Sequence, residues 1–258
     1  MFITRLTLAA AISFVLSFAA SAQQRILKLG TEGAYPPFNA LTADGKLEGF
    51  DIDIGNALCA EMKVSCEWVT QEWDGMIPAL QAGKFDIIMA SMFITDEREK
   101  QVDFTRRYYL TPPAFAARKG SGIAGVDPQA LSGKTLGVQS GTVYFDHLDK
   151  AYANSRIKAY PGVQEMQADL ISGRVDAIND DIVVVQKFLE TPEGECCEII
   201  GALKPDPAIF GLGAGIAVRS GDPLRDQLNI ALDAILANGV YKQINNKYFR
   251  FDVYGDAP

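Results

Sequence analysis

Histidine and cysteine are scarce in this chain of 258 residues. His147 is the sole histidine, and the four cysteines include no Cys-x-x-Cys pair. A structural zinc site needs four nitrogen or sulfur ligands at a recognisable spacing, so no metal site is expected. Basic residues are outnumbered as well: the formal net charge is −8, which argues against a nucleic-acid partner. A hydrophobic content of 48% with 22% charged residues indicates a globular protein with a substantial core.

Long hydrophobic runs are missing after residue 22. Before it, Arg5 precedes an apolar stretch at 6–20, and residues 20–22 form the small-x-small pattern Ala-Ser-Ala. This stretch is shorter than the roughly 20 residues that a membrane span requires, and no stop-transfer pattern follows it, which disfavours a membrane anchor. We therefore predict a cleavable signal peptide at 1–22 and a mature protein in an oxidising compartment outside the cytoplasm.

The four cysteines fall into two pairs with different prospects. Cys59 and Cys66 enclose six residues between an expected helix and an expected strand. A disulfide between them would close a short loop and stabilise the fold by roughly 2 kcal/mol. Cys196 and Cys197 are adjacent, and adjacent cysteines bond only through a strained ring. The sequence leaves the state of this second pair open.

Strands alternate with helices along the chain, and this order predicts an α/β fold. At 50–62, for example, Ile54, Leu58 and Met62 recur at the spacing of a helix that buries one face. The expected strands lie at 26–29, 66–69, 85–89, 135–139 and 157–160. The expected helices lie at 50–62, 74–82, 144–147, 164–172 and 223–237.

Two segments that lie 90 residues apart resemble each other. Residues 80–89 and 170–179 both contain a helix end, a glycine, a basic residue and a strand that opens with an acidic residue. The similarity favours two lobes of the same kind, although the pattern is also a common route from a helix into a strand. The chain would cross between the lobes at 110–113, which prolines stiffen, and at 210–215, which is rich in glycine.

Residues that follow the expected strands carry the chemistry of a binding site, because ligands of open α/β sheets bind outside the carboxyl ends of the strands. Arg98 can hold a carboxylate through two parallel hydrogen bonds, and the N–H of Thr142 at a helix start offers a second anion contact. Asp180 can hold an ammonium group, and Tyr35 and Trp73 offer two aromatic faces. Such a set suits a zwitterion.

Each of these residues also has a purely structural interpretation. Arg98 would be a surface charge on a charged helix, and Asp180 would cap the helix that follows it. Tyr35 and Trp73 would be core residues, although a tryptophan in a strand-to-helix loop is oddly placed for that role.

Five segments together resemble one protein family. They are GTEGAYPPF at 30–38, GFDID at 49–53, WDGMIPAL at 73–80, ITDER at 94–98 and KYFRFDVYG at 247–255. The sequence resembles the periplasmic substrate-binding proteins of polar amino-acid ABC importers, in particular the lysine/arginine/ornithine-, histidine- and octopine-binding branch. The resemblance covers essentially all of the chain after the signal. It implies two α/β lobes joined by two hinge strands, with lobe 1 formed by 23–111 and 212–258 and lobe 2 by 112–211.

The resemblance also implies roles for individual residues. Tyr35 and Trp73 would enclose the ligand side chain, where a desolvated cation stacked on an aromatic ring gains up to roughly 2 kcal/mol. Arg98 and the backbone of Thr142 would bind the α-carboxylate. Glu32 falls where the branch places an acid that faces a distal cationic group.

Asp180 and Ser91 would bind the α-ammonium group. Three positions depart from the family pattern: Phe93 stands where a carboxylate-binding serine is usual, and Ala90 and Val143 replace polar residues that often line the pocket. The ligand is therefore expected to be unusual for the branch. The full set of expected ligand-binding residues is Glu32, Tyr35, Trp73, Ala90, Ser91, Phe93, Arg98, Gln139, Thr142 and Asp180.

By this resemblance, the chain is expected to be a monomeric periplasmic binding protein that closes on a polar amino acid and delivers it to the membrane permease of an ABC transporter. A basic amino acid is the first expectation, and an opine-type arginine derivative the second. Cys59 and Cys66 coincide with the disulfide of the branch. No cofactor and no catalytic residue are expected.

Two other functions would use the same scaffold. One is an enzyme similar to cyclohexadienyl or arogenate dehydratases, against which His147 offers no fixed catalytic partner. The other is a sensory module that presents its ligand to a chemoreceptor, which would share the pocket and differ only in its partner.

Overall fold

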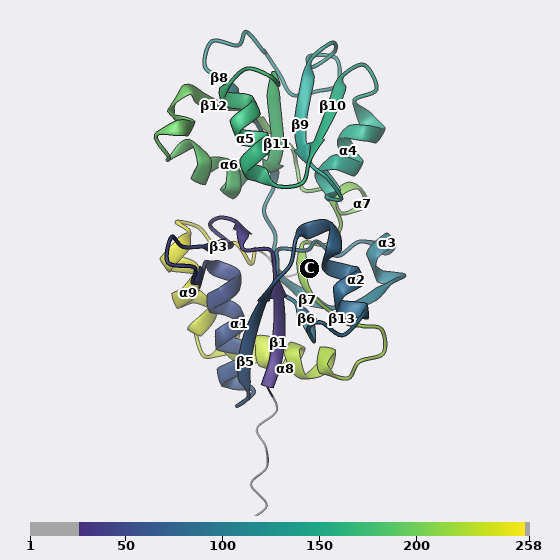
Figure 1. Ribbon diagram of the computed structural model, residues 1–258, viewed down its shortest axis with the longest axis vertical. Coiled ribbons are helices and arrows are strands. Elements are labelled where there is room, and N and C mark those ends of the chain that lie inside the picture. The colour runs from purple at the N-terminus through teal and green to yellow at the C-terminus, as the bar shows by residue number, and fades with distance from the viewer. Residues whose placement is uncertain (1–25, 256–258) are drawn as a thin grey trace, which may run out of the picture.

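The structure is a computed structural model, and it describes residues 26–255. The predicted signal peptide at 1–22 lies outside the described residues. Figure 1 shows two α/β lobes, one above the other, each built around a five-stranded sheet. The two-lobed α/β fold expected from the sequence is therefore confirmed. Within residues 26–255, no helix has both the length and the apolar character needed to cross a membrane.

Lobe 1, the lower lobe in Figure 1, has the strand order β5-β1-β6-β13-β7. Its strands are β1 (Ile26–Thr31), β5 (Ser65–Thr70), β6 (Ile87–Ile88), β7 (Val102–Tyr109) and β13 (Ala214–Arg219). Its helices are α1 (Phe50–Glu61), α2 (Met76–Gln81), α3 (Asp96–Glu99), α8 (Leu224–Ala237) and α9 (Val240–Tyr248), with a 3₁₀ turn η1 (Trp73–Gly75) before α2. A small sheet, absent from the sequence-based expectation, is formed by β2 (Ala34–Tyr35), β3 (Asn39–Leu41) and β4 (Leu47–Glu48).

Lobe 2, the upper lobe, has the strand order β10-β9-β11-β8-β12. Its strands are β8 (Pro113–Arg118), β9 (Thr135–Gln139), β10 (Arg156–Tyr160), β11 (Ala177–Asp181) and β12 (Cys197–Ala202). Its helices are α4 (Val143–Ala151), α5 (Val163–Ile171) and α6 (Ile182–Leu189), with a 3₁₀ turn η2 (Glu193–Cys196) before β12. The short helix α7 (Pro207–Phe210) lies where the chain returns toward lobe 1 (Figure 1).

The two sheets have the same construction. In each, the first three strands are parallel and the fourth is antiparallel to both of its neighbours. The fourth strand is β13 in lobe 1 and β8 in lobe 2, and each is the first strand after the chain has crossed from the other lobe. The crossings occupy 110–112 and 203–213. The predicted lobe boundaries fall within these crossings and stay a proposal.

The similarity between the segments 80–89 and 170–179 has a local physical basis. Gly83 and Gly173 end their helices with φ angles of 74–75°, a backbone conformation that glycine adopts without steric cost. Three residues after each glycine, Asp86 accepts a hydrogen bond from the N–H of Lys28 at 3.0 Å, and Asp176 accepts one from the N–H of Thr135 at 2.7 Å. In both lobes, a glycine thus ends the helix and an aspartate before the next strand binds a backbone N–H of the neighbouring strand.

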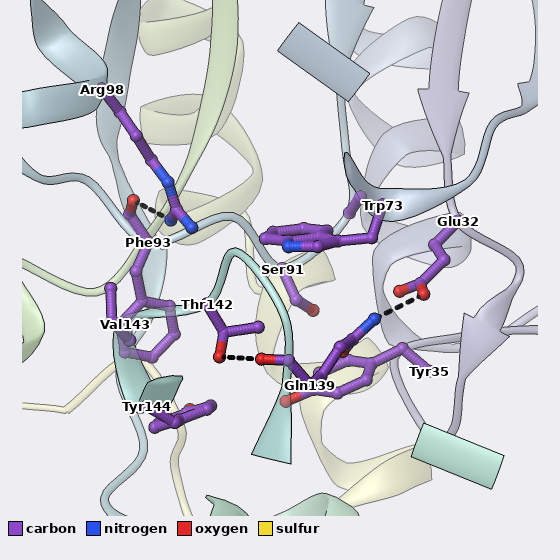
Figure 2. Close-up of a pocket in the computed structure, with 11 residues that line it drawn as sticks. Glu32, Tyr35, Trp73, Ser91, Phe93, Arg98, Gln139, Thr142, Val143 and Tyr144 are labelled. Atoms are coloured by element: carbon purple, nitrogen blue, oxygen red, sulfur yellow. Dashed lines mark hydrogen bonds between the residues drawn. The ribbon is translucent and has the colours of Figure 1, made fainter. Parts of the chain in front are cut away.

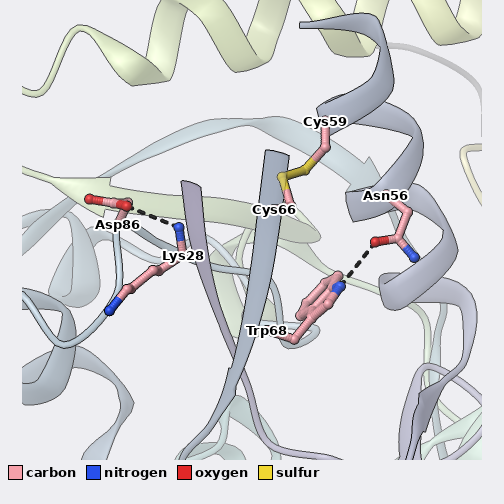
Figure 3. Close-up of a disulfide and its surroundings, with 6 residues drawn as sticks. All are labelled: Lys28, Asn56, Cys59, Cys66, Trp68 and Asp86. Atoms are coloured by element: carbon pink, nitrogen blue, oxygen red, sulfur yellow. Dashed lines mark hydrogen bonds between the residues drawn. A yellow bond between two sulfur atoms is a disulfide. The ribbon is translucent and has the colours of Figure 1, made fainter. Parts of the chain in front are cut away.

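The expected disulfide between Cys59 and Cys66 is present and joins the last turn of α1 to the edge strand β5 (Figure 3). Their Cα atoms lie 6.2 Å apart, within the usual range for a disulfide. On the same pair of elements, the indole N–H of Trp68 donates to the Asn56 side chain at 3.0 Å. Helix α1 is thus held to the sheet covalently as well as by packing.

The helix expected at 74–82 is divided into η1 and α2. Pro78 lies in the first turn of α2 and has no N–H to donate to the carbonyl four residues earlier. The preceding turn is closed instead by a hydrogen bond between residues three apart in the chain, from the Gly75 N–H to the Glu72 carbonyl. This tight turn places Trp73 at the end of the loop that leaves β5.

Candidate functional site

A pocket of about 340 Å³ lies between the two lobes (Figure 2). It is lined by Glu32, Tyr35, Trp73, Ala90, Ser91, Phe93, Arg98, Gln139, Thr142, Val143 and Tyr144. Nine of the ten expected ligand-binding residues are in this set, and the tenth, Asp180, touches the pocket residue Tyr35. The structure therefore brings the expected residues together, while their roles toward a ligand stay predictions.

Each lobe contributes its part of the pocket from strand ends and helix starts. In lobe 1, Glu32 follows β1, Tyr35 ends β2 and Trp73 opens η1. In lobe 2, Gln139 ends β9 and Thr142 caps α4, where its hydroxyl accepts from the N–H of Phe145, the third helical residue, at 3.1 Å. This is the carboxyl edge of the sheets, where α/β proteins bind ligands.

Arg98 lies with its guanidinium against the pocket rather than on the surface alone. It donates to the carbonyl of Phe93 at 2.7 Å and to that of Gly141 in the other lobe at 3.0 Å. Its Cζ lies 5.4 Å from the centre of the Trp73 ring. Burial lowers the pKa of Arg98 to about 10, so it stays charged at neutral pH. Two of the five guanidinium N–H groups are used by these carbonyls, which leaves others for an anion.

Asp180 is buried, with one carboxylate oxygen engaged and the other free of protein partners. Its Oδ1 accepts from the Tyr35 hydroxyl at 2.6 Å and from the Asp181 N–H at 2.7 Å, whereas Oδ2 is buried with no hydrogen-bond partner among the described residues. Burial raises the pKa of Asp180 to about 7. The interpretation of Asp180 as a helix cap is wrong, because Asp181 caps α6 by accepting from Val183 and is also bound by the Thr111 hydroxyl.

Glu32 lies at the opposite end of the pocket from Arg98 in Figure 2. The side-chain amide of Gln139 donates to Glu32 at 2.8 Å and to the carbonyl of Pro161 at 3.2 Å, so one amide group orients the carboxylate across the cleft. Burial raises the pKa of Glu32 to about 7. A cation placed beside it would offset this cost of burial and favour the ionised form.

Direct hydrogen bonds join the lobes around the pocket. They run from Tyr35 to Asp180, from Gln139 to Glu32, from Arg98 to Gly141, from Ser140 to Asp74 and from Gln164 to the carbonyl of Ala34. Several of these bonds involve pocket residues themselves. The geometry of the pocket is therefore coupled to how closely the lobes approach each other.

The hydroxyl of Ser91 is already committed to a buried partner. It donates to the carboxylate of Asp51 at 2.9 Å, and Asp51 also accepts from Asn39 and Tyr108. Burial raises the pKa of Asp51 to about 6. Ser91 can therefore face a ligand only as an acceptor, which is the capacity that an ammonium group requires.

Apolar side chains close one side of the pocket. The Phe93 ring lies 6.2 Å from the Tyr144 ring, and Val143 lies on the same side of the pocket (Figure 2). The Tyr144 hydroxyl donates to Asp181 at 3.4 Å, so its polar end turns away from the wall. Sequence reasoning missed Tyr144; its place in the first turn after the Thr142 cap is the signal that could have identified it.

Metal binding finds no support in the described residues, among which no group of three or more His, Cys, Asp or Glu side chains converges. His147 is half-buried and lies outside the pocket. Its ring packs at 5.6 Å from that of Tyr152 and at 4.9 Å from that of Phe210.

Comparison with known proteins gives consistent matches over almost the whole chain. Residues 27–251 match the bacterial extracellular solute-binding proteins, family 3. The chain is 48% identical to an L-arginine-binding protein of Pseudomonas aeruginosa, over 93% of this chain and 94% of that protein. It is 36% identical to a lysine/arginine/ornithine-binding periplasmic protein of Escherichia coli, over 93% and 95%. An ancestral arginine-binding protein bound to arginine superposes with a TM-score of 0.81 at 36% identity, over 88% of this chain and 99% of that one.

Proposed function

Because the chain belongs to the bacterial extracellular solute-binding proteins of family 3, we propose that it is the periplasmic substrate-binding component of an ABC importer for basic amino acids. The observation that carries this proposal is the charge arrangement of the pocket. The guanidinium of Arg98 lies at one end of the pocket and the partly buried carboxylate of Glu32 at the other, and the buried carboxylate of Asp180 accepts a hydrogen bond from the pocket residue Tyr35. A solute with one anionic and two cationic groups matches that arrangement.

In this proposal the α-carboxylate of the ligand binds the remaining N–H groups of Arg98. The first N–H groups of α4 have no partner within the helix, so the backbone at Thr142 adds further donors. The α-ammonium group binds Oδ2 of Asp180, which would gain the hydrogen bond that it lacks within the protein.

The ligand side chain then extends between Trp73 and Tyr35 toward Glu32 (Figure 2). A guanidinium fits this path better than a simple ammonium, because it is planar and can stack on aromatic rings while its edge donates to a carboxylate. The carbonyl oxygen of the Gln139 amide is a second acceptor beside Glu32. Arginine is therefore the proposed first ligand, with lysine and ornithine weaker.

Transport also requires a partner. We propose that ligand binding favours closure of the lobes about the two crossings, and that the closed monomer is recognised by a membrane permease. The protein would carry out no catalysis: the half-buried His147 packs against aromatic rings outside the pocket, so it is not available there as a general acid or base.

Isothermal titration calorimetry of the exported protein tests the proposal against arginine, lysine, ornithine, histidine, octopine and glutamine. Arginine should bind most tightly, with a dissociation constant of about 1 μM or lower. Absence of binding to every basic amino acid would contradict the proposal, and tighter binding of octopine would reassign the ligand to the opines. Incubation with prephenate or arogenate should yield no aromatic product, and formation of one would favour the enzyme.

A further inference from the structure

The adjacent cysteines Cys196 and Cys197 lie far along the chain from every pocket residue and are used by neither the pocket nor the crossings. Cys196 is the last residue of η2 and is exposed. Cys197 begins β12, an edge strand of the lobe 2 sheet, and is buried. The pair therefore marks the point where a tight turn becomes a strand.

The backbone at this point directs both side chains to one side. Within a strand, consecutive side chains point to opposite faces, which would separate the two sulfur atoms. Here only Cys197 has extended geometry, with φ −124° and ψ 167°, while Cys196 still belongs to the 3₁₀ turn. As a result the two Sγ atoms lie 2.7 Å apart. That separation is shorter than a relaxed contact between unbonded sulfur atoms, although it is longer than the roughly 2.05 Å of a disulfide bond.

The neighbouring strand holds this arrangement in place. The N–H of Lys119 donates to the Cys196 carbonyl at 2.9 Å, and Cys197 pairs with Arg118 in the β8–β12 ladder. The Lys119 ammonium also donates to the carbonyl of Glu195 at 2.7 Å. These bonds fix the backbone of both cysteines, and so the directions in which their side chains leave the chain.

We propose that Cys196 and Cys197 form a second disulfide, between adjacent residues, in the oxidising compartment that the proposed function implies. The oxidant is a disulfide compound, such as oxidised glutathione or a thiol-oxidising enzyme. The Cys196 thiolate attacks one of its sulfur atoms, the S–S bond of the oxidant breaks, and one thiol leaves. The Cys197 sulfur then attacks Cys196 and releases the second thiol. Two protein thiols are oxidised, one external disulfide is reduced, and both protons end on the released thiols.

The surroundings determine the order of these two steps. Cys196 is exposed and can meet the oxidant, whereas burial raises the pKa of the Cys197 thiol to about 12, which disfavours its attack on an external molecule. Once the mixed disulfide has formed on Cys196, the Cys197 sulfur is already adjacent to it. The nearby positive charges of Arg118 and Lys119 favour the Cys197 thiolate in this second step.

Mass spectrometry of the full chain, purified from the periplasm without reductant, tests this inference. The protein is denatured in excess iodoacetamide and digested, with and without prior reduction. Without reduction, the peptide that contains both residues should carry no alkyl group and should be lighter by two hydrogen atoms than the dithiol. After reduction it should carry two alkyl groups. Two alkyl groups without reduction, or glutathione or a second chain attached to Cys196, would overturn the inference.

Variants supply matched controls. Cys196→Ser should leave one alkylatable thiol at Cys197, while the Cys59–Cys66 peptide stays unmodified in every unreduced sample. Protein purified in reduced form and then treated with oxidised glutathione should form the Cys196–Cys197 bond as well, whether or not the protein binds amino acids. Arginine affinity, measured separately, should be unchanged in Cys196→Ser, so failure of the disulfide and failure of the proposed function are distinguishable.

Discussion

The two lobes share one sheet construction but supply different chemistry to the pocket between them. Lobe 1 contributes the aromatic rings of Tyr35 and Trp73 together with the charged side chains of Glu32 and Arg98. Lobe 2 contributes a helix N-terminus, the Gln139 amide and the adjacent Asp180. The two lobes share their strand directions, the glycine that ends a helix and the aspartate that follows it, whereas the residues after their strand ends differ. Function in this molecule therefore resides in the loops that the common construction positions.

The lobes also secure their outer strands differently. In lobe 1 the disulfide fastens edge strand β5 to α1. In lobe 2 the corresponding edge strand β10 is held to α5 by Asp169, which forms ion pairs with Lys158 and Arg174. Hydrogen bonds from Lys158 and its neighbours hold the pKa of Asp169 well below its usual range. The edge strand of lobe 1 therefore depends on a covalent bond. The edge strand of lobe 2 depends on ion pairs, which dissolved salt weakens.

Removing the cation from lobe 1 should have the largest effect on the shared pocket. Arg98→Ala should weaken arginine binding by about 100-fold or more, because losing one partner of a buried charge pair costs roughly 2–5 kcal/mol. Calorimetry measures the change. Lys100→Ala is the matched control, since Lys100 lies two residues away, is exposed and pairs with Glu97 on the surface. Equal affinity of the Arg98 variant and the wild type would contradict the assignment of the carboxylate site to lobe 1.

Neutralising the acid at the far end of the pocket should have a smaller and selective effect. Glu32→Gln should weaken arginine and lysine by about 10-fold, the value of one hydrogen bond to a charged group, and should leave glutamine affinity nearly unchanged. A competition assay with the three amino acids measures the selectivity. An equal loss of affinity for all three amino acids would indicate that Glu32 shapes the pocket and does not bind the distal cationic group of the ligand.

Acidification should oppose arginine binding in the wild type through the same group. Burial raises the pKa of Glu32 to about 7, so lowering the pH from 8 to 6 protonates it and weakens the attraction for a cation. In the absence of ligand the sign is reversed: the folded pKa lies above the unfolded value, so the contribution of Glu32 to stability is full at low pH and is lost as the pH rises through 7. Glu32→Gln should reduce both dependences and leave the part that comes from Asp180, whose pKa burial also raises to about 7. Unchanged slopes would contradict this account.

The smallest expected effect is on stability and concerns the two aspartates that accept a backbone N–H at corresponding positions of the two sheets. Asp176→Ala removes the acceptor for the Thr135 N–H in lobe 2 and should lower the free energy of unfolding by about 1 kcal/mol. Asp86→Ala in lobe 1 should cost about 1 kcal/mol more, because Asp86 also pairs with Arg219 at 3.3 Å. Urea titrations measure both values. A larger loss for Asp176→Ala than for Asp86→Ala would contradict this ranking.

The sequence predicted the features that depend on local pattern. The helix at 50–62, the glycine-terminated helices and the position of Trp73 between a strand and a helix follow from periodicity and turn chemistry, and all are present within a few residues. The internal similarity of 80–89 and 170–179 favoured two lobes, and family resemblance added the lobe boundaries and the Cys59–Cys66 pairing, which residue spacing alone left open.

Features that depend on contacts between distant residues could not be predicted in the same way. The hydroxyl of Ser91 is bound by Asp51, 40 residues earlier, and no local pattern records that bond. Asp180 and Asp181 are both acidic and adjacent, and only the backbone direction at the end of β11 decides which one caps α6 and which one binds the pocket residue Tyr35. The same holds for Tyr144, whose ring direction is set by the start of α4.

The position of β13 between β6 and β7 determines when each sheet can be completed on the ribosome. All five strands of lobe 2 lie in one continuous stretch, from β8 to β12, and emerge before β13 is made. The synthesis of lobe 1 begins first, but its sheet is completed only when β13 (Ala214–Arg219) has been made and inserts between β6 and β7, which are already synthesised. During translation, lobe 2 therefore has all of its strands before lobe 1 does. Until β13 emerges, β6 and β7 of lobe 1 each lack the neighbour that joins them in the sheet.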